Sequence, residues 1–160
     1  MTLTATETVR AHRPLAVQIS EGLLILLGVT ALAGGAALVF GLGDGQLMAP
    51  AAWLENIPLI HSWVAPGLVL GIGFGLGSLL VAYGMIRLPR WEWAAVIERA
   101  TGHHWSWIGT ILIGAGHMVW IGLELVYLPF SLLHPIYGAI GVALLLLPFL
   151  PSVRKAFRIG

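Results

Sequence analysis

The sequence predicts an all-α membrane protein in which four transmembrane helices form an up-down-up-down bundle with both termini cytoplasmic. The first observation is composition: of 160 residues, 58% are hydrophobic and only 9% are charged, which lies far outside the range of soluble globular domains. The second is the spacing of four long apolar segments. The third is the placement of the basic residues between those segments. Together they predict a single transmembrane domain over residues 1–160.

Each apolar segment is close to the ~20 residues that a helix needs to cross ~30 Å of hydrocarbon. The predicted spans are residues 17–40, 63–86, 106–128 and 132–151. The outer loop, residues 41–62, is long, and a short helix is expected in it around Ala51–Asn56. In the inner loop, residues 87–105, an amphipathic run ends before Gly102. This pattern predicts a short helix at the membrane interface with a glycine stop.

The basic residues fix the predicted orientation. None lies in the 41–62 loop or in the 128–133 turn, so both of these connections are expected outside the cytoplasm. All eight flank the other ends of the spans: Arg10, Arg13, Arg87, Arg90, Arg99, Arg154, Lys155 and Arg158. They are too few and too close to the membrane for nucleic-acid recognition, so the expected contact is with membrane lipid.

Glycines recur in the second span at a spacing that favours close helix packing. One ridge carries Gly67, Gly71 and Gly75, and a second ridge on another side carries Gly73 and Gly77. Small residues four apart allow a neighbouring backbone to approach closely. Two ridges imply two close neighbours, one inside the bundle and the other a second subunit or a partner protein. A nucleotide-binding glycine motif would need a strand–turn–helix context, which a membrane span does not provide.

The third span contains two titratable residues where lipid-facing side chains would be expected. His117 falls near its midpoint, and Glu124 lies two helical turns, ~10 Å, further outward. Seven residues at 100° each place the two side chains within ~20° of one another around the helix. Because a buried charge in the membrane is costly, such residues usually face the bundle interior and are paired or functional.

Three interpretations of this polar face stay open. Glu124 could make a structural hydrogen bond within the bundle. His61, Glu124 and His134, expected at similar depth near the outer surface, could bind a divalent metal or exchange protons. A haem could use His117, with a second ligand from His61 or His134 reaching inward or from His117 of another chain. His103 or His104, fourteen or thirteen residues before His117, could serve a second haem. No compact metal-ligand motif and no cysteine support a particular cofactor, so the absence of a cofactor is the first expectation.

At the level of the whole chain, two stretches resemble small, uncharacterised four-span integral membrane proteins of bacteria. These are SWVAPGLVLGIGFGLG, in which a proline and a glycine open a glycine-rich span, and LHPIYGAIGVALLLLP near the end of the chain. The resemblance implies a multi-pass protein of the bacterial inner membrane. It implies no activity.

The expected function follows from these features. The glycine ridge favours a non-enzymatic accessory or assembly subunit that associates with itself or with a larger membrane complex. The alternative is a redox or proton-handling protein with a cofactor near His117 and Glu124. No Ser-His-Asp arrangement is apparent around the serines, so an enzyme is not the first expectation.

Overall fold

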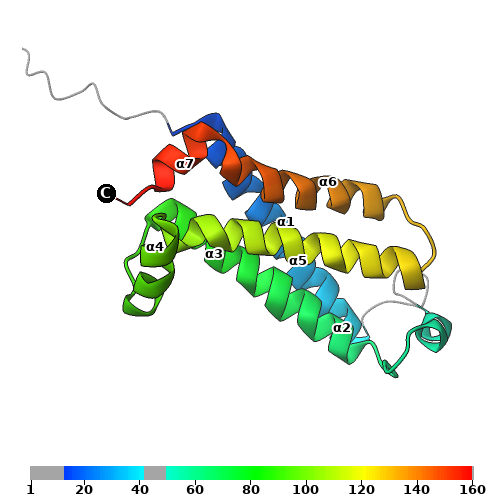
Figure 1. Cartoon of the computed structure of the whole chain (residues 1–160). Coiled ribbons are helices and arrows are strands. Elements are labelled where there is room, and N and C mark those ends of the chain that lie inside the picture. Colours follow the sequence, from blue (N-terminus) through cyan, green and yellow to red (C-terminus); the bar gives the residue numbers. More distant parts are fainter. Residues whose placement is uncertain (1–12, 42–49, 160) are drawn as a thin grey trace, which may run out of the picture.

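The computed structural model describes residues 13–41 and 50–159, and over these residues the protein is built from helices (Figure 1). Three of them are long and apolar enough to cross a membrane. They are α1 (Leu15–Phe40), the continuous helix Val64–Arg87, and α5 (Trp105–Tyr127). Their bounds lie within two residues of the predicted spans, because the apolar runs that define them are long and end at glycine, arginine or proline signals.

The fourth predicted span, residues 132–151, is shorter than expected. Helix α6 (Leu133–Leu146) continues as the 3₁₀ turn η4 (Leu147–Phe149), and the chain then bends by 68° into α7 (Pro151–Phe157). The bend lies at Leu150, which is extended because the residue before a proline is disfavoured in the helical region. The described residues therefore contain three membrane-length helices, or four if the bent pair is counted as one span.

Both connecting loops contain the short helices that the sequence predicts. The outer loop forms a 3₁₀ helix, η1 (Ala51–Asn56). The inner loop forms a 3₁₀ turn, η3 (Glu92–Ala94), followed by α4 (Ala95–Thr101). Gly102 ends α4 in the left-handed conformation, with φ at 66°, which glycine adopts without the steric cost of a Cβ atom.

The helix Val64–Arg87 is not uniform. It begins as α2 (Val64–Leu68), passes through a π-helical segment, η2 (Val69–Leu76), and ends as α3 (Gly77–Arg87). The first glycine ridge, Gly67, Gly71 and Gly75, packs on α1. A Cβ atom at Gly35 of α1 would lie 2.5 Å from the backbone nitrogen of Gly71. The two backbones are therefore in direct contact, as expected for small residues at helix crossings in membranes.

The second glycine ridge is only partly engaged. A Cβ atom at Gly77 would lie 3.4 Å from the Ile113 side chain on α5, whereas one at Gly73 would meet no atom within 4 Å. The first ridge thus serves the interior of the chain, and its glycines are buried. Of the two predicted ridges, the first is therefore the one that packs inside the bundle.

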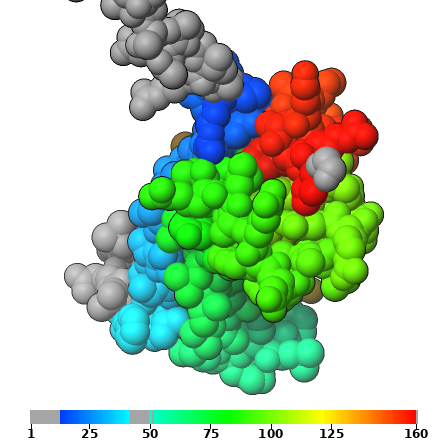
Figure 2. Space-filling model, turned by 90° about the vertical axis from the view of Figure 1, so that its left-hand side faces the viewer, coloured from blue at the N-terminus to red at the C-terminus, as the bar shows by residue number. Residues whose placement is uncertain are grey.

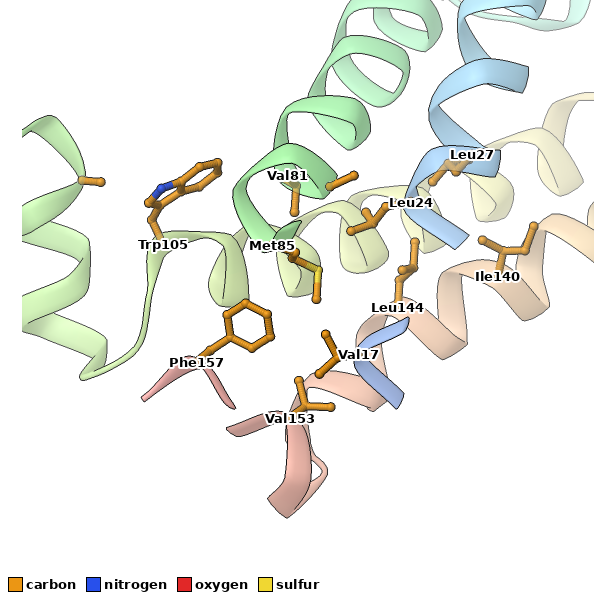
Figure 3. Close-up of a cluster of buried hydrophobic side chains, with 12 residues drawn as sticks. Val17, Leu24, Leu27, Val81, Met85, Trp105, Ile140, Leu144, Val153 and Phe157 are labelled. Carbon is orange, nitrogen blue, oxygen red and sulfur yellow. The ribbon is translucent and has the colours of Figure 1, made fainter. Parts of the chain in front are cut away.

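The end of the bundle that carries Arg13, Arg87 and the basic residues of α7 is here called the basic end. Contacts between segments that are distant in sequence stabilise it. Arg13 donates a hydrogen bond to the carbonyl oxygen of Ile86 (2.8 Å), and the backbone N–H of His104 donates to the carbonyl of Phe157 (2.8 Å). Figure 2 looks onto this end, with α7 in red and the α4 region in green. Behind it lies an apolar cluster that joins Val17, Met85 and Phe157, together with Leu144 of α6 (Figure 3).

Candidate functional site

A cavity of about 630 Å³ lies between α1, α5 and α6 in the half of the molecule away from the basic end. Its walls are made by Leu27 to Gly34 of α1, by His117 to Glu124 of α5, and by Leu133 to Tyr137 of α6. Leu70 of η2, Pro50 and Trp53 of the outer loop, and the turn between α5 and α6 contribute the remaining lining. The volume falls within the ~300–1,000 Å³ that is typical of small-molecule sites.

His117 is the most deeply placed polar residue of this cavity. Its side chain is 2% exposed, and within residues 13–41 and 50–159 neither ring nitrogen makes a hydrogen bond. The backbone of Tyr137 is near enough to interact with the ring, but not in an acceptable hydrogen-bond geometry. Because a buried polar group without a partner is costly, a histidine in this situation is suited to an external hydrogen-bonding group.

Aromatic rings fix the orientation of His117. Phe74 packs edge-on against it, with ring centroids 5.3 Å apart, and Tyr137 packs similarly at 6.0 Å. Phe74 lies in η2, so the π-helical segment positions the ring that supports His117. Single π-helical insertions occur often at functional sites, where they alter which side chains face a site. The histidine is thus held in place without any use of its polar atoms.

Glu124 lines the same cavity and is engaged on both carboxylate oxygens. The indole N–H of Trp120, one helical turn earlier, donates a hydrogen bond of 2.7 Å to Oε1. Oε2 lies 3.7 Å from Nε2 of His134 on α6. The carboxylate is therefore oriented between two helices. The prediction that His117 and Glu124 share an inward face is confirmed, since both line the cavity.

Backbone groups of Ser131 hold the ring of His134 in place. Nδ1 lies 2.9 Å from the backbone nitrogen of Ser131 and 3.2 Å from its carbonyl oxygen. The other ring nitrogen, Nε2, faces Glu124 at 3.7 Å, which is longer than a hydrogen bond. His134 and Glu124 therefore lie side by side, at the end of the cavity formed by the α5–α6 turn.

The predicted three-residue metal site does not assemble. Glu124 and His134 are brought together, but His61 is exposed and does not line the cavity. Within residues 13–41 and 50–159 no group of three or more His, Asp or Glu side chains is close enough to hold a metal ion. Asp44, an acidic residue of the outer loop, lies outside the described residues.

The haem interpretation receives limited geometric support. His104 does not line the cavity and contacts Ser106 (2.8 Å) and the carbonyl of Pro89 (3.0 Å) through its two ring nitrogens. His103 lines a separate cavity at the basic end. Two histidines of the described residues line the cavity between α1, α5 and α6: His117, whose ring nitrogens make no hydrogen bond to these residues, and His134, whose Nε2 lies 3.7 Å from Glu124.

Several residues of the cavity were not singled out in the sequence. Trp120 could have been found, because it precedes Glu124 by four residues and therefore shares its helix face. Thr30 and Trp53 could not, because their approach depends on how α1 and the outer loop pack against α5. A threonine in an apolar span is weak evidence for a binding site, because its hydroxyl can donate to a carbonyl of its own helix. The hydroxyl of Thr30 donates in this way to the carbonyl of Leu26.

Comparisons with protein-family models, with curated proteins and with solved structures find no match for this chain. The site is therefore interpreted from its own geometry.

The pair of Trp120 and Glu124 offers a test of this geometry. Replacing Trp120 with phenylalanine removes the donor to Glu124, and the free energy of unfolding is expected to fall by ~1–2 kcal/mol. A double-mutant cycle with Glu124→Met, measured by denaturant titration in detergent micelles, should give a coupling energy of ~1 kcal/mol. Strictly additive effects of the two substitutions would show that the bond contributes nothing.

Proposed function

We propose that this protein is a multi-pass membrane protein, with four spans and both ends in the cytoplasm, that binds a small and largely apolar molecule in the cavity between α1, α5 and α6. The orientation rests on the basic residues, which gather at one end of the bundle as the positive-inside rule requires of a cytoplasmic face. Residence in a bacterial inner membrane is part of the same proposal.

The observation that carries the proposal is the state of His117. It is buried at the cavity wall, held by aromatic rings, and offers one donor and one acceptor that no group in the described part of the chain uses. The rest of the lining is predominantly aliphatic and aromatic, with Leu27, Leu70 and Trp120 among its members. A ligand that fits this chemistry is an apolar molecule with a carbonyl or hydroxyl group that reaches His117.

The second polar group of the cavity defines what the site could do with such a ligand. Oε2 of Glu124 and Nε2 of His134 lie 3.7 Å apart, too far for a hydrogen bond to each other, so each is placed to contact a ligand. A bound molecule whose carbonyl or hydroxyl group gains or loses a proton would find a proton donor and acceptor in the same cavity. This supports the proton-handling or redox form of the proposal over simple storage of a ligand.

The proposal is tested by blocking the cavity. Thr30 lines it, whereas the preceding residue Val29 is 55% exposed and faces away from the cavity. We expect an organic extract of the purified wild-type protein to contain one dominant small molecule near one equivalent per chain. Thr30→Phe should lose that molecule, and the matched substitution Val29→Phe should keep it.

An absorption spectrum of the same preparations identifies a haem by its Soret band and separates it from other ligands. The proposal fails if the wild-type extract contains only phospholipid. It also fails if Thr30→Phe and Val29→Phe retain the same molecule in equal amounts.

A subunit that associates with itself or with a larger complex is the second candidate function, and the second glycine ridge would provide its surface. Gly73 is exposed and has open space around it, between the exposed apolar side chains of Ile72 and Leu76. A neighbouring helix could approach closely there. Gly73→Leu should then lower the native mass of the protein in nanodiscs to that of a single chain, and an unchanged mass would exclude this surface.

A further inference from the structure

A second cavity, of about 640 Å³, lies at the basic end of the molecule. It is formed where the end of α4, the start of α5 and the bend between η4 and α7 meet. Its lining includes the side chains of Thr101, His103, Phe149, Arg154, Lys155 and Arg158. Among residues 13–41 and 50–159 no Asp or Glu contributes to it, so the described lining concentrates positive charge.

The three cations of this cavity are free to meet an external anion. Within residues 13–41 and 50–159, the ion pairs join Arg13 with Glu21, His104 with Glu98, and His134 with Glu124. Arg154, Lys155 and Arg158 take part in none of them. Their side chains gather around one hollow, where they would repel one another unless an anion is present.

The position of α7 indicates that this anion belongs to the membrane. Because the chain bends by 68° after Phe149, α7 departs from the direction of α6. Its apolar side chains Val153 and Phe157 are buried against the bundle, and its basic side chains face outward. This arrangement is typical of a helix that lies in the interface plane.

An apolar track leads from the cavity into the membrane-spanning part of the molecule. Phe149 lines the cavity and is 51% exposed, and Leu146, almost one turn earlier on α6, is 59% exposed. A soluble phosphate would make no use of this surface, whereas an acyl chain attached to a phosphate would cover it. Basic pockets on the cytoplasmic side of membrane helices are common sites for anionic lipid headgroups.

We propose that the cavity lined by Arg154, Lys155 and Arg158 binds the phosphate headgroup of an anionic phospholipid, with an acyl chain along Leu146 and Phe149. This site is separate from the cavity around His117 and does not depend on the function proposed above. Occupation of the site would hold α7 against the membrane surface.

The experiment uses the full chain in nanodiscs made from equal amounts of phosphatidylglycerol and phosphatidylcholine, followed by native mass spectrometry of the lipids retained. Wild-type protein is expected to retain phosphatidylglycerol in preference to phosphatidylcholine. Arg154→Gln/Arg158→Gln should lower that preference by about fivefold for each charge removed. The matched control, Arg87→Gln/Arg90→Gln, removes the same charge from the same end but outside the cavity, and should retain the preference.

Lys155→Gln, a smaller change, provides a second variant if the double substitution impairs folding, and it should also lower the preference about fivefold. Equal losses in the cavity variant and the control would overturn the proposal, because they would show a general surface effect. Absence of any preference in the wild type would also overturn it. Complete displacement of the lipid by soluble glycerol 3-phosphate would contradict the lipid assignment, because it would show that the site binds a free phosphate.

Discussion

Replacing Gly35 with alanine is expected to disrupt the contact between α1 and the helix Val64–Arg87. The added Cβ atom would lie 2.5 Å from the backbone nitrogen of Gly71 and 2.6 Å from the carbonyl oxygen of Gly67. Backbone atoms within helices cannot move aside as a flexible side chain can, so α1 must shift as a whole. We expect a loss of ~3 kcal/mol or more in the free energy of unfolding.

The control for this prediction is the same substitution at glycines with space around them. A Cβ atom at Gly22 of α1, or at Gly138 of α6, would meet no atom within 4 Å. Gly22→Ala and Gly138→Ala should therefore leave stability unchanged or slightly higher, since alanine is the better helix former. Unfolding by titration with SDS in mixed micelles measures all three variants. A Gly35→Ala protein as stable as the two controls would show that the helices do not cross at this contact.

Replacing His117 with leucine is expected to separate binding from stability. Both ring nitrogens lack a protein partner, so the substitution removes no protein hydrogen bond and relieves the cost of a buried polar group. The free energy of unfolding of the ligand-free protein should stay the same or rise by ~1 kcal/mol. Affinity for the cavity ligand should fall by about tenfold or more, because a hydrogen bond to the ligand is lost.

His61→Leu is the matched control for this second prediction. His61 is exposed and lies outside the cavity, so the same change should leave both ligand affinity and stability unaltered. If His117→Leu instead destabilised the protein by more than ~1 kcal/mol while ligand binding persisted, His117 would have a structural role. If His117 had only a structural role, His117→Leu would not abolish ligand binding while leaving stability unchanged.

The helices that the sequence predicts best are those with the longest apolar runs. The long apolar runs predict the bounds of α1 and α5 to within two residues, and Gly102 predicts the end of α4. These signals are reliable because they are local in the chain. The predicted span over residues 132–151 does not include the bend into α7. The apolar run continues to Pro151, but this proline holds Leu150 in an extended conformation and so interrupts the helix. The π-helical segment η2 has no comparable signal in the sequence, because it depends on how the helix packs against its neighbours.

The candidate site was predictable only along one helix. The spacing of seven residues placed His117 and Glu124 on one face, and both line the cavity. The opposite wall comes from α1, and its position depends on the backbone contact between Gly35 and Gly71. The sequence indicated that Gly71 would face a close neighbour, but it did not indicate which helix that neighbour would be. For the same reason, the sequence did not indicate which of the two glycine ridges would lie inside the bundle.

The stability of the site and the packing of the glycines are therefore connected. Gly28 and Gly35 of α1 lie against the helix Val64–Arg87, while Thr30 and Gly34, on another side of α1, line the cavity. The close contact of α1 with the helix Val64–Arg87 therefore sets the position of the cavity wall that α1 forms. For this reason Gly35→Ala is expected to impair ligand binding as well as folding, although Gly35 does not line the cavity.

The most direct test of the proposed function is an experimental density map of the protein crystallised from a lipidic phase after purification under conditions that retain bound small molecules. We predict non-protein density in the cavity between α1, α5 and α6, with a polar atom within hydrogen-bonding distance of a ring nitrogen of His117. A map in which the cavity is closed, with both nitrogens of His117 bonded to protein groups, would contradict the account.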